Sequence, residues 1–129
     1  DYDVADKVLI ELAKVIHSNI NEFDMVGRLN GDEFLVSILN TTGEYQVEEV
    51  AKKIISDFTE ISILINEEKK QYLKKTICIG FETYRLHSDI TITECIKNAD
   101  IALYEAKNRG RSQFFKFSEL SAEDTIDLF

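Results

Sequence analysis

An Asn-Gly step between two apolar runs is the feature that most constrains the fold of this 129-residue chain. Asn30 and Gly31 can both adopt positive φ at little cost, and such a pair joins antiparallel strands through a tight turn. The residues before it (24–29) and after it (34–39) are mostly apolar and have the length of strands. The sequence therefore predicts an antiparallel hairpin with two carboxylates just past its turn.

Three further segments have apolar residues at helical spacing. We expect helices over residues 4–20, 45–60 and 91–108. The last of these opens with Thr91-Ile92-Thr93-Glu94, which has the form of a capping box, and Gly110 fits a stop just past its end. Short strands are expected over residues 61–65, 75–84 and 114–117, with the charged stretch 66–70 joining the first two.

The order of these elements favours an α+β fold in which helices pack on one largely antiparallel sheet. The length predicts one domain, and no apolar run approaches the roughly 18 residues of a membrane span. A net charge of −9 argues against a general nucleic-acid binder, so any phosphate site must be local or assisted by a metal. Cys78 and Cys95 lack metal-ligand spacing and are interpreted as reduced thiols of a cytosolic protein.

Asp32 and Glu33 directly follow the glycine of the predicted hairpin. Two adjacent carboxylates can hold a hard divalent cation, and the bare glycine backbone lets a ligand approach closely. Acidic residues also occur in turns simply because they are well solvated there. The sequence Asn-Gly-Asp-Glu at residues 30–33 does not by itself decide between these two interpretations.

A group of cations lies at the end of the third predicted helix, at Lys107, Arg109 and Arg111. Such cations can bind the phosphates of a nucleotide, but they also complement the helix dipole without any ligand. Both interpretations stay open on these residues alone. Tyr104 in the same helix is expected in the core.

Taken together, four motifs resemble the GGDEF domains of the diguanylate cyclase family. Residues 28–34, Arg-Leu-Asn-Gly-Asp-Glu-Phe, resemble the signature R-x-G-G-D-E-F. Residues 99–111 resemble the family motif A-D-x-A-L-Y-x-A-K-x-x-G-R at every fixed position. Residues 76–80 resemble T-x-S-x-G with cysteine in place of serine, and residues 6–9 fit the end of G-H-x-x-G-D-x-x-L. The resemblance covers about residues 1–117.

The resemblance implies a nucleotide-cyclase-like (ferredoxin-like) fold and a specific reaction. Two such domains, each with one GTP, meet as a homodimer and form cyclic di-GMP with release of two pyrophosphates. Mg²⁺ or Mn²⁺ neutralises the triphosphates and helps to activate the 3′-hydroxyl. The domain itself is expected in the cytoplasm, with no contact to nucleic acid or membrane.

The resemblance also implies roles for individual residues. Asp32 and Glu33 match the catalytic, metal-binding carboxylates. Gly31 matches a glycine at which the backbone passes close to the nucleotide. Asn30 replaces the first signature glycine, and its side chain projects into space that the family leaves for the nucleotide.

The remaining substrate-binding residues lie outside the hairpin. Asp6 matches the aspartate that hydrogen-bonds the guanine edge, and Lys107 and Arg111 match the pair that grips the terminal phosphates. The family's inhibitory product site is R-x-x-D, and here Asn21 replaces the arginine while Asp24 is retained. We therefore expect no product inhibition through that site.

The family's first strand, which carries the other metal-binding aspartate, has no counterpart in this sequence. We expect residues 1–117 to be a GGDEF domain without that strand, and the 129 residues alone to be inactive. Residues 118–129 are interpreted as a tail or linker, similar to the junction that leads into an EAL domain; a sensor domain is a further expected neighbour.

Three functions remain open on the sequence. The first is a diguanylate cyclase. The second is a degenerate GGDEF domain that binds GTP or nothing and regulates a larger protein. Asn30, Tyr2 and Asn21 favour this second function. The third, a scaffold for dimerisation, has the least support because both the carboxylates and the cations are retained.

Overall fold

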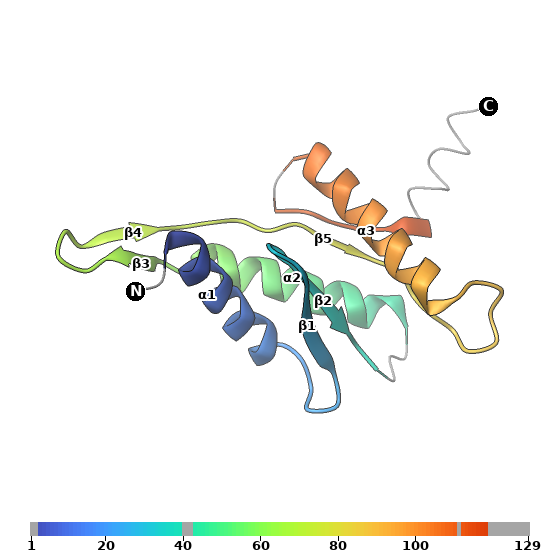
Figure 1. The fold of residues 1–129 in the computed structure, drawn as a ribbon. Coiled ribbons are helices and arrows are strands. Elements are labelled where there is room, and N and C mark those ends of the chain that lie inside the picture. The colour runs from blue at the N-terminus through green and yellow to red at the C-terminus, as the bar shows by residue number, and fades with distance from the viewer. Residues whose placement is uncertain (1–2, 40–42, 111, 119–129) are drawn as a thin grey trace. The chain divides into compact units, whose positions relative to one another are not determined.

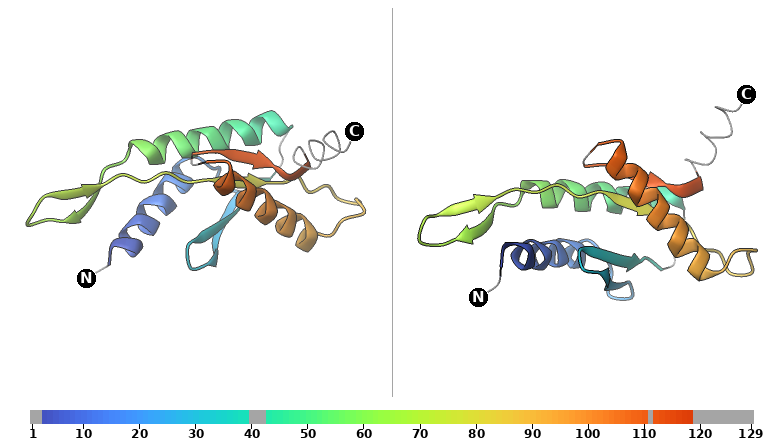
Figure 2. Two further views of the ribbon diagram at one scale, coloured as in Figure 1. Left: turned by 90° about the horizontal axis from the view of Figure 1, so that it is seen from above. Right: turned by 45° about the horizontal axis from the view of Figure 1, so that its top comes forward.

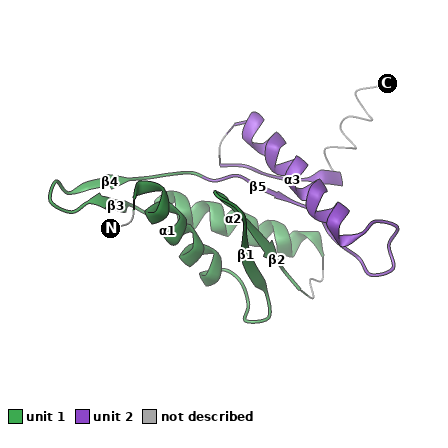
Figure 3. Cartoon of the chain, in the orientation of Figure 1, with its two compact units in different colours: residues 1–76 green, residues 77–129 purple. Residues whose placement is uncertain are grey.

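The computed structural model describes residues 3–39, 43–110 and 112–118 of the chain. The chain divides into two compact units, residues 1–76 and 77–129 (Figure 3). Among these described residues, the first unit holds two helices and two hairpins, and the second holds one helix between two strands (Figure 1). Both units therefore mix helix and strand, as the α+β interpretation predicts.

The first unit begins with α1 (Val4–Ser18), followed by β1 (Met25–Asn30) and β2 (Glu33–Ser37). Then come α2 (Glu44–Glu60), β3 (Ile63–Asn66) and β4 (Gln71–Leu73). Helix α1 packs on α2 and on β3. The buried apolar residues of this unit are Leu12, Val15, Ile16, Ala51, Ile54, Ile55, Phe58 and Ile63.

The second unit contains a β–α–β element, formed by β5 (Ile79–Phe81), α3 (Ile92–Asn108) and β6 (Phe114–Lys116). The two strands pair in parallel, and α3 packs on both. Gly80 in β5 makes this packing possible, because a Cβ there would lie 2.7 Å from the Cα of Leu103 and closer still to backbone atoms of Leu103 and Ala99. The buried apolar residues are Phe81, Cys95, Ala102 and Ala106.

The three predicted helices are confirmed, and so are the cues at their ends. The Asp3 side chain caps α1 by accepting a 2.8 Å bond from the Asp6 amide. The hydroxyl of Thr91 accepts a 3.1 Å bond from the Glu94 amide and caps α3. Gly110 adopts φ of +129°, which suits a glycine that ends a helix. Tyr104, however, is 67% exposed, so its assignment to the core is wrong.

The strands depart from the sequence analysis in two respects. Within the part of the chain that the structure describes, they form three two-stranded sheets, of which two are antiparallel and one is parallel. The stretch expected as one long strand over residues 75–84 keeps only β5, and β4 lies just before it. Each short strand thus pairs with a single partner, whereas the sequence predicted one largely antiparallel sheet.

The hairpin itself is confirmed, but its turn differs from the predicted one. Asn30 pairs with Glu33 across the ladder, so the two loop residues are Gly31 and Asp32. Neither Asn30 nor Gly31 has the positive φ that the Asn-Gly step suggested. An irregularity of register between Arg28 and Asn30 accounts for the shift of the turn by one residue.

Candidate functional site

The β1–β2 turn gathers four of the residues that the sequence singled out. Asn30 ends β1, Gly31 and Asp32 form the loop, and Glu33 begins β2. Asp32 is exposed and has no hydrogen-bond or ion-pair partner among the described residues, whereas Glu33 is half-buried. The Asn30 amide donates a 3.4 Å bond to the Glu33 carboxylate. One carboxylate is thus held by its neighbour, and the other is left facing solvent.

Arg28 is the first residue of the signature-like motif, and the sequence leaves open whether it positions the hairpin or contacts phosphate. Its guanidinium Nη2 donates a hydrogen bond to the carbonyl oxygen of Gly31. The arginine therefore reaches along the hairpin to the same turn that carries Asp32. The only sequence signal for this contact is the spacing of three residues between the cation and the glycine.

Asp6 lies in the first turn of α1, in the same unit as the hairpin. Its side chain is exposed, and its backbone amide is the one that the Asp3 carboxylate caps. Strand β1 runs back toward the end of the unit where α1 begins (Figures 1 and 2). The first turn of α1 and the β1–β2 turn therefore lie at one end of this unit.

Lys107 lies in the last turn of α3, in the second unit, and is exposed. Arg111 lies outside the described residues. The backbone around Lys107 is well fixed: the Arg109 amide donates to the Glu105 carbonyl at 3.0 Å, and the Gln113 side chain donates to the Arg109 carbonyl at 2.9 Å. Hydrogen bonds therefore fix the C-terminal end of α3, which carries this cation.

Asp24 has a structural role at the base of the hairpin. Its carboxylate accepts hydrogen bonds from the backbone amides of Asn21 at 2.8 Å and Leu39 at 3.0 Å. These bonds join the loop after α1 to the end of β2. They favour the interpretation of Asp24 as a strand-edge residue.

No group of three or more His, Cys, Asp or Glu side chains that could enclose a metal ion occurs within residues 3–39, 43–110 and 112–118. The hairpin nevertheless fits Mg²⁺, since this ion usually binds one or two protein carboxylates together with water and substrate phosphates. Asp32 and Glu33 supply that number. They are the residues that would hold the ion.

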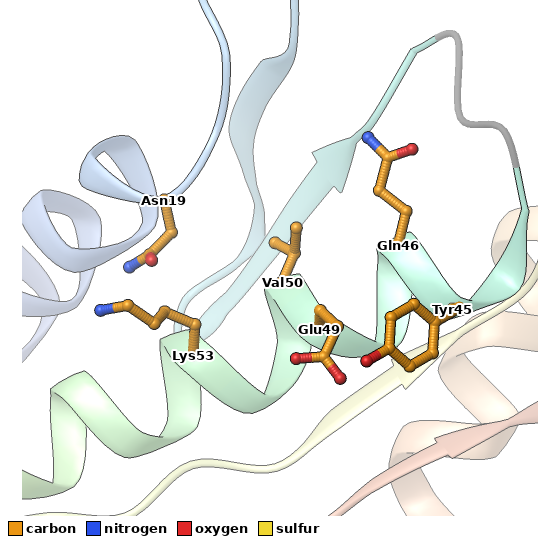
Figure 4. A pocket seen from close by; sticks show the side chains of 6 residues that line it. All are labelled: Asn19, Tyr45, Gln46, Glu49, Val50 and Lys53. Atoms are coloured by element: carbon orange, nitrogen blue, oxygen red, sulfur yellow. The ribbon is translucent and has the colours of Figure 1, made fainter.

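An open depression on the first unit lies elsewhere, between the end of α1 and the first half of α2 (Figure 4). It is lined by Asn19, Tyr45, Gln46, Glu49, Val50 and Lys53, none of which is a predicted site residue. Both Asn19 and Lys53 donate to the Asp57 carboxylate, at 3.1 and 2.8 Å. These hydrogen bonds lower the pKa of Asp57, and the bond from Lys53 has the larger effect. The polar groups here join α1 to α2.

In the part of the chain that the structure describes, no helix is both long enough and apolar enough to cross a bilayer.

Comparison with known proteins identifies relatives over most of the chain. A family model described as "Diguanylate cyclase, GGDEF domain" matches residues 2–113. Diguanylate cyclase A of Treponema denticola is 35% identical over 108 residues, which cover 84% of this chain and 28% of that protein. The bifunctional diguanylate cyclase/cyclic di-GMP phosphodiesterase MucR of Pseudomonas aeruginosa is 28% identical, over 98% of this chain and 18% of its own length.

A solved structure supports the fold. The GGDEF domain of TpbB from Pseudomonas aeruginosa matches with a TM-score of 0.76 and 29% identity, over 86% of this chain and 62% of that one. The α+β, nucleotide-cyclase-like fold expected from the sequence is thereby confirmed. The chain spans less than a third of the length of either curated relative.

Proposed function

The chain belongs to the GGDEF family of diguanylate cyclase domains, and from that premise we propose that it makes cyclic di-GMP from two molecules of GTP. Each 3′-hydroxyl forms a bond to the α-phosphorus of the other GTP while the bond to the β-phosphate oxygen breaks. Two phosphodiester bonds form and two pyrophosphates leave. Because each GTP sits on a different domain, the reaction requires a homodimer.

The observation that carries this proposal is the exposed Asp32 carboxylate on the β1–β2 turn, beside the half-buried Glu33. The Asp32 carboxylate, which has no partner among the described residues, is available to a cation. Together with Glu33, which accepts a hydrogen bond from the Asn30 amide, it gives one turn two carboxylates that suit a bound Mg²⁺ or Mn²⁺. When bound, such an ion neutralises phosphate charge and lowers the pKa of a coordinated hydroxyl. Asp32 and Glu33 are the residues of this chain that would hold such an ion.

The other proposed contacts bind two further parts of the nucleotide, the guanine base and the terminal phosphates. The exposed Asp6 carboxylate accepts hydrogen bonds from the guanine edge, for which two N–H donors are available. Lys107 and Arg111 bind the terminal phosphates. Gly31 has no atom within 4 Å of the position of an added Cβ, which leaves room for a nucleotide against the backbone. These cations and the metal offset a chain of net charge −9.

A regulatory module that binds GTP without turnover is the second candidate. The observation that favours it is Asn30, whose amide donates to Glu33 at 3.4 Å and so engages one of the two signature carboxylates. Asn21 in place of the family arginine, together with the structural bonds of Asp24, supports the absence of product inhibition in either case. A scaffold without nucleotide has the least support.

We further propose that residues 1–117 are the GGDEF domain of a longer cytoplasmic or membrane-anchored protein and that residues 118–129 lead toward a neighbouring domain. The curated relatives are several times longer than the chain, and MucR combines cyclase and phosphodiesterase activities. An EAL domain is the neighbour that the sequence after Arg111 suggests, and a sensor domain is the other. The first strand of the family would then belong to the longer protein.

The test is GTP turnover by the longest natural protein that contains this sequence. That protein is incubated with GTP and Mg²⁺, and the products are separated by chromatography. Cyclic di-GMP that increases with time and enzyme supports the cyclase. GTP binding without product supports the regulatory module and overturns the cyclase, and neither binding nor product leaves the scaffold.

A further inference from the structure

Arg28 makes an unusual contact for an exposed cation in an acidic chain. Its Nη2 donates to the neutral carbonyl oxygen of Gly31, and no ion pair joins Arg28 to a carboxylate in the described ranges. Arg28 pairs with Phe34 across the ladder, so its side chain extends from the regular part of the hairpin to the turn. The guanidinium thus holds a backbone carbonyl of the turn and does not pair with a carboxylate among the described residues.

The bonded carbonyl determines the position of Asp32. The Gly31 carbonyl and the Asp32 amide belong to one planar peptide group, which ends at the Asp32 Cα. Fixing the oxygen therefore fixes the plane from which the Asp32 side chain departs. Gly31 has no Cβ to restrict its dihedral angles, and no neighbouring atom lies within 4 Å of where one would be. Packing therefore does not restrain this glycine.

The two carboxylates of the turn are held in different ways. Glu33 is held through its side chain by the Asn30 amide at 3.4 Å. Asp32 has no such side-chain bond among the residues that the structure describes, so its placement depends on the backbone. The pairing of Asn30 with Glu33 closes the turn on both sides, and the bond from Arg28 restrains the Gly31 carbonyl within it.

We propose that Arg28 is a positioning residue that holds the peptide of Gly31 and Asp32 so that the Asp32 carboxylate is presented in one orientation to the metal-bound substrate. The proposal rests on the proposed function, because it assigns Arg28 a role in that site. It differs from direct phosphate binding, in which the guanidinium would contact the nucleotide. Both roles use the same cation, so the test must separate them without GTP.

The test compares Arg28→Met, which keeps the length of the side chain but removes the donors, with Arg28→Lys, which restores one donor. The first readout is the ¹⁵N order parameters of Gly31 and Asp32 in the ligand-free 129-residue chain. We expect about 0.85 in the wild type and below about 0.6 in Arg28→Met, with a value near the wild type in Arg28→Lys. Amide signals of α1 and α2 show whether each variant is folded.

The second readout is steady-state kinetics of the longest natural protein. With a misplaced Asp32 we expect kcat to fall about tenfold in Arg28→Met while the KM for GTP stays within about twofold, and Arg28→Lys recovers most of kcat. Unchanged order parameters in a folded Arg28→Met variant overturn the proposal. So does a rise in KM with kcat intact, which indicates a direct phosphate contact.

The two readouts also separate this inference from the proposed function. If the wild-type protein forms no cyclic di-GMP, the cyclase proposal fails. The order parameters then still decide whether Arg28 holds the turn.

Discussion

The β1–β2 hairpin of the first unit and the β5–α3–β6 element of the second both carry residues proposed to bind GTP, yet different interactions hold them. At the hairpin the turn is held by side chains within three residues of it, from Arg28 to Gly31 and from Asn30 to Glu33. In the second unit, contacts far apart in sequence hold the end of α3: Ile79 donates to the Gln113 carbonyl at 2.9 Å, and Cys78 to the Gly110 carbonyl at 3.6 Å.

The difference indicates that the two regions tolerate change differently. An exposed turn with local bonds can lose a contact without unfolding the domain, so substitutions there should alter activity more than stability. A helix packed directly on a strand backbone has no such freedom, so substitutions there should reduce stability first. The predictions below test this contrast, from the largest expected effect on stability to the smallest.

A methyl group added to each of two glycines gives the sharpest contrast. Gly80→Ala places a Cβ against the backbone of Ala99 and Leu103, and we expect a loss of about 3 kcal/mol in the free energy of unfolding. Gly31→Ala meets no atom within 4 Å, and we expect a change within about 0.5 kcal/mol. Urea unfolding measures both. Equal losses in the two variants would contradict the contrast.

The buried ion pair of the second unit gives the next effect. Lys116 and Glu82 lie 3.9 Å apart, with side chains only 8% and 10% exposed. Lys116→Met leaves the Glu82 carboxylate buried beside an apolar side chain, and we expect a loss of about 2 to 3 kcal/mol in the free energy of unfolding. Arg28→Met is the matched change on the exposed hairpin, with an expected loss below about 1 kcal/mol. Equal losses of stability in Lys116→Met and Arg28→Met would contradict the expected difference between the buried pair and the exposed hairpin.

The smallest expected effect is a pH dependence of stability that comes from the contact between α1 and α2 in the first unit and does not involve the hairpin. Hydrogen bonds from Lys53 and Asn19 hold the pKa of Asp57 below the usual value of an aspartate. A lowered pKa in the folded state contributes stability above the unfolded value, and that stability is lost as the pH falls through the folded value. We expect the free energy of unfolding to fall less between pH 5 and pH 3 in Asp57→Asn than in the wild type. Parallel curves for the two proteins would contradict this assignment.

Much of the fold follows from the sequence because its signals are local. The helix limits depend on caps such as Thr91 and on stops such as Gly110, and both are confirmed. The turn was predicted one residue too early, because Asn30 joins the ladder opposite Glu33 instead of occupying the loop. Propensity favoured a left-handed Asn30, but the pairing of the two strands determined the register instead.

Other features depend on contacts that no local pattern contains. The parallel pairing of β5 with β6 joins strands separated by the whole of α3, whereas the sequence predicted one largely antiparallel sheet. The exposure of Tyr104 depends on which face of α3 packs on the strands. The hydrogen bond from Arg28 could not be predicted either, because it depends on where the Gly31 carbonyl oxygen lies in three dimensions. The candidate residues of the site were found from motifs, whereas the support of the turn became visible only in three dimensions.

The central claim is that Asp32 on the β1–β2 turn is required for the metal-dependent synthesis of cyclic di-GMP. The most direct measurement compares product formation by Asp32→Asn and Asp89→Asn, two exposed aspartates in different parts of the chain, in the longest natural protein with GTP and Mg²⁺. We predict a loss of at least about a hundredfold for Asp32→Asn, with stability unchanged, and wild-type turnover for Asp89→Asn. Wild-type turnover in the Asp32→Asn variant would contradict the account.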